Sequence, residues 1–377
     1  ADFNGDGYAD LLFGGALYSG SAGGTFSKTI LSLAGSMQVT PIGDVNADGF
    51  ADLACSDAPR TTSRINPNPL PPAGNVYVYY GGATGFASTP SVTLAGTDPN
   101  GAFGGWIDAT DVNGDGISDL VVTASCAPYD TTAQACGGGR MYVFTGGATG
   151  LSTTPLSTVS FVNYLQFHQG ILAAVGDTNG DGFGDMARGV GSDSNSQTSP
   201  LEIWYGSASG FTTANMTTLS VGYVGDALAG LDYNGDGYAD VASSFHRFRG
   251  YTSGYTIYLG GPNGVTSASG GGGGTTTDFC CALAPAGDVN GDVIGDLNVA
   301  QILTLSVNAS DSVLCGGGIC GGSITSPSSN SPAGFGVGDM NGDGFEDELM
   351  TLTGAYSIYF GSPTFGATPL TPDVTLQ

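Results

Sequence analysis

The residues best suited to chemistry are those of a nine-residue acidic segment that occurs seven times. Each copy carries Asp at positions one, five and nine and Asn at position three, and in six copies the sixth residue is Gly. The copies begin at Asp2, Asp44, Asp111, Asp177, Asp232, Asp288 and Asp339. Recurrence of this kind indicates a repeat architecture, in which each copy belongs to one structural unit.

Oxygen-bearing side chains at alternate positions suit Ca²⁺, which takes roughly six to eight oxygen ligands in flexible geometry. Side chains at positions one, three, five and nine and the carbonyl at position seven would be the ligands, while Gly at position six permits a positive φ. We predict up to seven Ca²⁺ sites, one per repeat, with these residues: Asp2, Asn4, Asp6, Tyr8 and Asp10; Asp44, Asn46, Asp48, Phe50 and Asp52; Asp111, Asn113, Asp115, Ile117 and Asp119; Asp177, Asn179, Asp181, Phe183 and Asp185; Asp232, Asn234, Asp236, Tyr238 and Asp240; Asp288, Asn290, Asp292, Ile294 and Asp296; Asp339, Asn341, Asp343, Phe345 and Asp347.

Two other interpretations of the segment are weaker. An EF-hand begins in the same way but needs an acidic residue at position twelve and flanking helices; position twelve here is Phe13, Cys55, Val122, Arg188, Ser243, Val299 or Met350. Metal-free Asx-rich turns could explain one copy, but seven copies that keep every Asp and Asn favour a metal. The ions are expected to stabilise hairpins rather than to take part in catalysis. Val293 replaces Gly in the sixth copy, and because a β-branched residue is strained at positive φ, this site should be the weakest.

The residues around the acidic segments predict short β-strands between Gly-rich turns. Aromatic and β-branched residues alternate in NVYVYY (75–80), MYVF (141–144) and YTIYL (255–259), which is typical of strands. Each repeat reads as four antiparallel strands with the acidic loop between the first and second, and seven such sheets around an axis form an all-β, seven-bladed β-propeller. A row of sandwiches would need longer repeats.

One propeller domain, residues 1–377, is predicted, with blades near 1–35, 36–97, 98–165, 166–221, 222–277, 278–330 and 331–377. The first blade lacks its first strand, so closure of the ring would need a strand from upstream residues or from another molecule. Because the chain opens inside a motif and without Met, we expect a processed or truncated piece whose export signal lies upstream.

Charge and cysteine content restrict the partners and the cellular compartment that we expect for this protein. The chain has 33 acidic and 7 basic residues, which disfavours nucleic acid and anionic membranes as partners. No apolar stretch is long enough to span a membrane. Local disulfides Cys126–Cys136 and Cys315–Cys320 would suit an oxidising compartment; Cys280 and Cys281 are unassigned, and Cys55 is expected to be a buried free thiol. We predict a secreted or cell-surface protein.

The motif GDVNADGFADL, followed by GNVYVYYGG, resembles the FG-GAP repeat of integrin α-subunit propellers and their bacterial secreted relatives. This resemblance implies a seven-bladed propeller with calcium loops on one face and ligands on the other. On this chain the ligand face would include residues 57–74, 127–139, 191–199 and 246–254, where His246, Arg247 and Arg249 are weak candidates for ligand contact. A solvated loop is the alternative for these three. Trp106 and Trp204 could stack on sugars, but both lie on predicted strands and are expected in the core; His168 is expected to be structural.

No nucleophile, zinc or phosphate-loop motif supports catalysis. The first hypothesis is therefore an extracellular adhesion or recognition module for a protein or glycan. The second is a structural subunit of an extracellular assembly or filament that self-associates by strand donation at the open blade. A carbohydrate-active lyase or dehydratase is the third, because some FG-GAP-like propellers have such activity.

Overall fold

Short runs of alternating aromatic and β-branched residues, interrupted by Gly turns, fold here into antiparallel sheets. In the computed structural model the described residues form strands and turns, and none of them is helical. The structure describes residues 1–35, 37–59, 70–133, 135–161, 171–189, 199–221, 227–246, 253–266, 273–274, 282–301, 309–314, 323–326, 335–351, 356–363, 365 and 372–376. No helix within these ranges is long and apolar enough to cross a membrane.

Six sheets have four antiparallel strands each, and we number these blades after the repeat that forms them. Blade 2 contains β4 (Gln38–Gly43), β5 (Asp52–Ser56), β6 (Asn75–Tyr79) and β7 (Val92–Ala95). Blade 3 contains β8 (Phe103–Thr110), β9 (Asp119–Ala124), β12 (Gly139–Phe144) and β13 (Ser157–Phe161). Blade 4 contains β14 (Ile171–Gly176), β15 (Asp185–Gly189), β16 (Ser199–Trp204) and β17 (Met216–Val221).

The remaining blades repeat this order. Blade 5 contains β18 (Leu228–Leu231), β19 (Asp240–His246), β20 (Ser253–Tyr258) and β21 (Gly273–Gly274). Blade 6 contains β22 (Ala282–Gly287), β23 (Asp296–Gln301), β24 (Ala309–Leu314) and β25 (Ser323–Ser326). Blade 7 contains β26 (Phe335–Gly338), β27 (Asp347–Thr351), β28 (Tyr356–Tyr359) and β29 (Val374–Thr375). In each repeat the acidic loop joins the first strand to the second.

The first repeat forms a sheet of only three strands, β1 (Leu11–Phe13), β2 (Ala16–Ser19) and β3 (Ser27–Ile30). The prediction of seven blades is therefore corrected to six four-stranded blades and this three-stranded first sheet. In the first repeat the described strands begin only after the acidic loop, where the carbonyl of Ala1 accepts the N–H of Asp10 (N–O 2.6 Å). The prediction of four-stranded antiparallel blades is confirmed for the other repeats.

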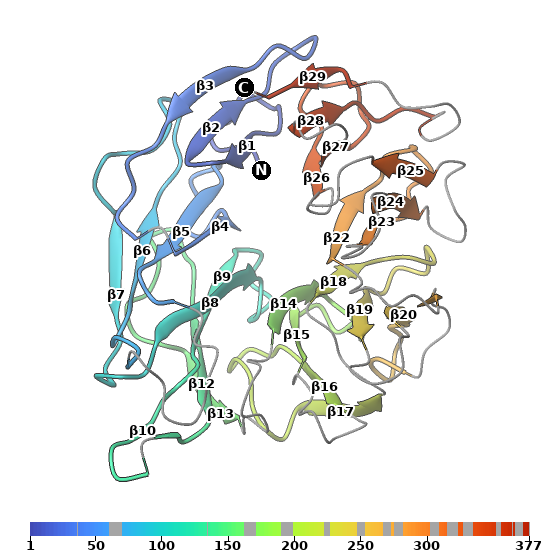
Figure 1. The fold of residues 1–377 in the computed structure, drawn as a ribbon. Helices are drawn as coiled ribbons and strands as arrows, with labels where there is room; N and C mark the ends of the chain where they lie inside the picture. Colours follow the sequence, from blue (N-terminus) through green and yellow to red (C-terminus); the bar gives the residue numbers. More distant parts are fainter. Residues whose placement is uncertain are drawn as a thin grey trace.

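The sheets lie in sequence order around a common centre (Figure 1). The first strands of blades 2 to 7 contact one another in turn, from β4 through β8, β14, β18 and β22 to β26. A cluster of buried apolar residues lies at each junction between successive sheets, including those of the first sheet with blade 7 and with blade 2. Burial between sheets rather than within them thus stabilises the ring.

Candidate metal sites and a pocket beside the first loop

The first Asp of each acidic loop organises the turn that follows it. Its carboxylate accepts the N–H of the sixth loop residue in all seven copies, at 2.7–2.9 Å. It also accepts the N–H of the fifth residue at 3.0–3.3 Å. These bonds are those of an Asx-type turn, in which a short acidic side chain substitutes for a main-chain acceptor. All seven loops therefore share one backbone shape.

The Asn and the fifth-position Asp lie close together in this turn. The Asn oxygen accepts the N–H of the fifth residue at 2.8–3.0 Å in every loop. The fifth Asp accepts the N–H of the seventh residue at 2.9–3.1 Å. In six loops the Asn amide also donates to the fifth Asp. Most of these side chains are exposed, so they are accessible to an ion from solvent.

The ninth-position Asp has a different environment, because it is the first residue of the second strand and is buried. Its side chain is 3% exposed in the first loop and 0% in the other six. One carboxylate oxygen accepts the N–H of the second loop residue, or of the third in the third loop, at 2.8–3.1 Å. In six loops the other oxygen accepts the N–H of the Gly that follows the third strand, at 2.8–3.0 Å. The ninth Asp thus joins three parts of one sheet.

Burial makes these ninth carboxylates difficult to ionise. Desolvation raises the pKa of Asp52, Asp119, Asp185 and Asp240 to about 6 and that of Asp347 to about 7. The hydrogen bonds from backbone N–H groups oppose this rise, and the neighbouring loop carboxylates add to it. A cation near the loop would offset the same cost, since an opposite charge favours the ionised form.

The donor set of each loop fits a hard cation such as Ca²⁺. All prospective ligands are oxygens, and the nine-residue segments contain no Lys, Arg or His that could neutralise their carboxylates. An ionised carboxylate has about four acceptor positions, so the N–H bonds described above leave lone pairs for an ion. Within the described residues no three Asp, Glu, His or Cys side chains converge on a point. Binding would therefore require carboxylate rotations within a turn that is already formed.

The sixth loop has Val293 where the others have Gly, and the structure confirms the expected positive φ there. Val293 has φ 70° and is 88% exposed, and its N–H donates to Asp288 like that of its Gly counterparts. The second loop has a similar exception at position four, where Ala47 has φ 57°. Both residues adopt a conformation that costs an L-residue roughly 1–2 kcal/mol.

Replacement of Val293 by Gly is expected to stabilise the protein by about 1 kcal/mol, because Gly adopts this φ without strain. Chemical denaturation would measure the change. The matched control is Gly237→Val in the fifth loop, where φ is 88° and an added Cβ would contact nothing; this substitution should destabilise by a similar amount. Equal stability of Val293→Gly and the native protein would contradict the assignment of strain.

Main-chain hydrogen bonds connect the seven loops into a closed circle. In each case the N–H of the eighth loop residue donates to the carbonyl of the first Asp of the preceding loop, at 2.6–3.4 Å. The donors are Ala51, Ser118, Gly184, Ala239, Gly295, Glu346 and Ala9, and the last of these bonds to Asp339 of blade 7. The loops of blade 7 and the first sheet are thus joined in the same manner as all other neighbours. A distortion of one loop acts directly on the next.

The seventh loop residue reinforces this circle. Its side chain packs on the fourth residue of the preceding loop, where Gly leaves room for a ring: a Cβ on Gly342 would overlap Tyr8, and one on Gly291 would overlap Phe345. Both glycines have positive φ. Position seven was assigned from the sequence only as a carbonyl ligand, so its packing role is an addition from the structure.

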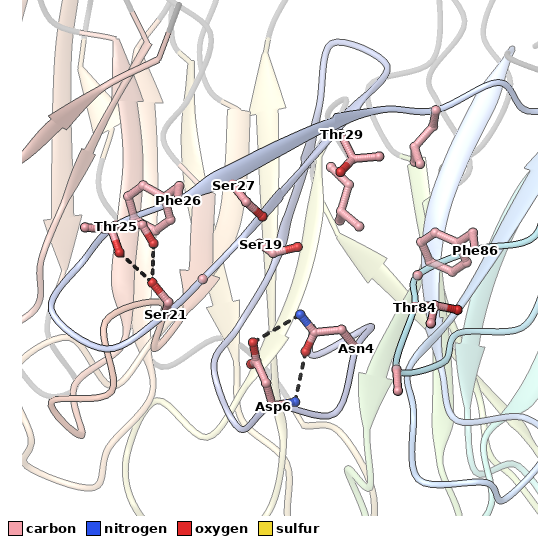
Figure 2. Close-up of a pocket in the computed structure, with 15 residues that line it drawn as sticks. Asn4, Asp6, Ser19, Ser21, Thr25, Phe26, Ser27, Thr29, Thr84 and Phe86 are labelled. Atoms are coloured by element: carbon pink, nitrogen blue, oxygen red, sulfur yellow. Dashed lines mark hydrogen bonds between the residues drawn. The ribbon is translucent and has the colours of Figure 1, made fainter.

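A pocket of about 560 Å³ lies between the first sheet and blade 2, next to the first loop. Its lining includes Asn4 and Asp6 of the loop, and Figure 2 shows them near Ser19. Phe86, from the turn after β6, lies on the opposite side of the pocket (Figure 2). The sequence analysis did not identify the non-loop residues of the pocket. The pocket is formed by two repeats, and no motif within one repeat predicts it.

The weak candidates for ligand contact remain predictions. Arg247, Arg249 and the side chain of His246 lie outside the described residues, as do residues 191–198 and His168. The prediction of a core position is confirmed for Trp204, which is 1% exposed. Trp106 lies on β8 and is partly buried.

One buried ion pair was not anticipated from the sequence. Arg188 on β15 donates to Glu202 on β16 at 2.7 Å, and both side chains are almost fully buried. The guanidinium also lies 4.0 Å from the ring centre of Phe161 on β13, in the neighbouring blade. Arg188 occupies position twelve of the fourth segment, so this position contributes to packing between blades rather than to an EF-hand site.

The cysteines that the structure describes follow the sequence prediction. Cys126 and Cys136 form a disulfide that closes the loop containing β10 (Tyr129–Asp130) and β11 (Ala135–Cys136). Cys55 on β5 is free and buried, and burial raises its thiol pKa to about 12. The predicted pair Cys315–Cys320, and Cys280 and Cys281, lie outside the described residues.

Cys55 is expected to resist alkylation by iodoacetamide in the native protein, because only the thiolate reacts and the side chain is 0% exposed. Peptide mass spectrometry after labelling would measure this site separately from the other cysteines. In concentrated guanidinium chloride Cys55 should label fully. Rapid labelling of Cys55 under native conditions would contradict the buried position.

Comparison with known proteins gives partial matches in sequence and a broad match in fold. The FG-GAP repeat matches residues 103–144, which comprise β8 to β12 of blade 3. Integrin alpha-7 of Rattus norvegicus is 33% identical over 160 residues, covering 40% of this chain and 13% of that protein. Phosphatidylinositol-glycan-specific phospholipase D of Mus musculus is 29% identical over 154 residues, covering 34% of this chain and 18% of that protein. The chain thus spans less than a fifth of these relatives.

Among solved structures, a crystal structure of BBS1N in complex with ARL6DN is similar, with a TM-score of 0.54. The match covers 95% of this chain and 89% of that one, but only 14% of residues are identical, so the similarity concerns the fold alone. Taken with the arrangement of the sheets, these matches show a β-propeller fold in which residues 103–144 match the FG-GAP repeat.

Proposed function

We propose that this chain is a calcium-binding β-propeller that acts outside the cell as an adhesion or recognition module for a protein or glycan. The Ca²⁺ is structural: it neutralises the loop carboxylates and stabilises the hairpins. One observation carries the proposal, namely the closed circle of seven oxygen-rich loops with a common backbone shape.

Calcium stoichiometry is the direct test of the metal sites. Protein dialysed against calcium and then against metal-free buffer should retain close to seven Ca²⁺ per chain, measured by inductively coupled plasma mass spectrometry. Asp236→Ala should remove one. If the dialysed protein retains no Ca²⁺, the proposal is contradicted. If it retains Mg²⁺ instead of Ca²⁺, the loops bind a metal but the assignment of that metal as Ca²⁺ is wrong.

The recognition role is supported by the relatives. Integrin alpha subunits match this chain over 33–40% of its length, and a propeller of similar fold, BBS1N, was solved in a complex with another protein, ARL6DN. The match to phospholipase D covers 18% of that enzyme. The phospholipase activity of that enzyme is therefore not assigned to this chain.

Binding to a glycan array and to immobilised extracellular-matrix proteins, with and without EDTA, would test recognition. Calcium-dependent binding without turnover of the bound glycan is the expected result. Release of reducing ends or of unsaturated sugars would instead support a carbohydrate-active enzyme. Failure to bind any glycan or matrix protein in the calcium-loaded state would contradict a recognition module.

A second candidate is a subunit of an extracellular assembly, and the first sheet favours it. Among the described strands, β1 pairs with β2 alone, whereas the second strand of every four-stranded blade pairs on both sides. An open edge of this kind can accept an added strand. Light scattering coupled to size-exclusion chromatography tests this: concentration-dependent oligomers would support assembly, and a monomer at all concentrations would exclude it.

A further inference from the structure

The pocket beside the first loop lies at a place where the side chain that packs against the next blade is short. The residue before the Gly whose N–H is accepted by the ninth Asp is Tyr80 in blade 2 and Tyr205 in blade 4. In blades 5 and 7 it is Leu259 and Phe360, and in blade 3 it is the shorter Thr145. At the same place in the first sheet, before Gly20, it is Ser19. These positions correspond to one another because each precedes the Gly whose N–H donates to the ninth Asp of the same sheet.

In blades 2 and 4 the tyrosine fills the junction with the next blade. The hydroxyl of Tyr80 accepts the N–H of Leu151 at 2.8 Å, and that of Tyr205 accepts the N–H of Val265 at 3.2 Å. Leu151 and Val265 are then 6% and 4% exposed. Phe86 occupies the corresponding turn opposite the first sheet but is only partly buried. Ser19 is too short to cover it, and the pocket of about 560 Å³ remains.

The lining combines an apolar surface with many hydroxyl groups. On the first sheet Leu17 pairs with Thr29 and Ser19 pairs with Ser27, so one face of β2 and β3 presents three hydroxyls above an apolar floor. Aromatic rings contribute from Phe26 and Phe86, and the ring of Phe86 is held by an edge contact with Phe3 (centroids 5.0 Å apart). The first acidic loop supplies one amide and one carboxylate.

These groups discriminate among classes of ligand. The lining contains no Lys, Arg or His, so an anion would meet the Asp6 carboxylate without compensation. A purely apolar molecule would desolvate the hydroxyls and the carboxylate without replacing their hydrogen bonds. A cation would compete for Asp6 with the ion that we propose for the first loop. A neutral polyhydroxyl ligand with an apolar face satisfies both the rings and the hydroxyls.

We propose that this pocket binds a neutral saccharide unit. The apolar face of the sugar packs on Phe86, and its hydroxyls hydrogen-bond to the hydroxyls of β2 and β3 and to the Asn4 amide. This inference rests on the proposed recognition function, to which it gives a location and a ligand class. Blade 3 also has a short residue, Thr145, at this position, but the Phe211 of the next blade is 1% exposed. Among the described junctions only the first combines a short residue with a partly exposed Phe, so one site per chain is expected.

Saturation-transfer difference NMR with the methyl glycosides of glucose, galactose, mannose and xylose provides the test, on the calcium-loaded full chain. Ser19→Tyr places in the first sheet the residue that the chain itself uses in blades 2 and 4, and it should abolish saturation transfer without loss of stability. Phe86→Ala should weaken binding roughly tenfold, as expected for loss of an aromatic contact, and Phe86→Tyr should restore it. Ala22→Tyr, an exposed position on the same hairpin outside the lining, is the control and should bind like the native chain.

The outcomes separate this inference from the proposed function. The inference would be overturned if none of the four glycosides received saturation from the protein. It would also be overturned if the glycosides received equal saturation from the native chain and from Ser19→Tyr. Binding of Nα-acetyl-lysine methylamide that Ser19→Tyr abolishes would replace the saccharide with a cationic side chain. If calcium stoichiometry and matrix binding persist while the glycosides fail, only the saccharide pocket is wrong; if all three fail, the recognition module is wrong as well.

Discussion

Removal of Ca²⁺ by EDTA is expected to lower the melting temperature of this protein by about 10 °C or more. An ion that binds only the folded form adds roughly 2.7 kcal/mol per site when its free concentration is 100 times its Kd. Seven sites in one cooperative ring would together contribute about 19 kcal/mol. Differential scanning calorimetry in calcium and in EDTA would measure the shift. The hydrogen-bonded circle of loops is the reason to expect a single transition rather than seven.

The control for this experiment is Mg²⁺ added in place of Ca²⁺ after EDTA treatment. Mg²⁺ demands a smaller, octahedral shell and should restore little of the stability. A melting temperature that does not change between calcium and EDTA would contradict structural calcium. Several separate melting transitions after calcium removal would be compatible with calcium binding. They would contradict the cooperative coupling between neighbouring loops.

Substitution of Asp240 by Ala is expected to destabilise the metal-free protein by about 2–5 kcal/mol, because two partly buried N–H groups lose their acceptor. These donors are Tyr233 and Gly260, at 3.0 and 2.8 Å from a carboxylate that is 0% exposed. The matched variant is Asp236→Ala in the same loop, whose carboxylate is exposed. It should cost less than about 1 kcal/mol without calcium. Chemical denaturation in EDTA would compare the two.

In calcium the two variants should behave differently. Both should bind one Ca²⁺ fewer, so Asp236→Ala becomes clearly destabilising there, while blade 5 loosens and the ring stays folded. Asp240→Ala combines the loss of the ion with the loss of two partly buried hydrogen bonds and should remain the less stable of the pair. Equal stability of the two variants in EDTA would show that the ninth Asp has no structural role apart from metal binding.

The sequence by itself determined the repeat, the strand pattern and the residues of the acidic loops, since these depend on order within a few neighbouring residues. The alternation in residues 75–80 became β6, the nine-residue segments became loops of one shape, and Cys126 and Cys136, ten residues apart, formed the local disulfide. The prediction of seven blades was wrong, since among the described strands six sheets have four strands and the first has three.

Only the tertiary structure decided what happens between repeats. The circle of loop hydrogen bonds joins residues such as Ala51 and Asp2, and the buried ninth Asp accepts the N–H of a Gly that follows the third strand. The pocket depends on Ser19 and Phe86, which lie in different repeats and show no shared motif. Local patterns specify elements, whereas junctions arise from side chains that meet only after the ring has formed, and this is why the pocket was not foreseen.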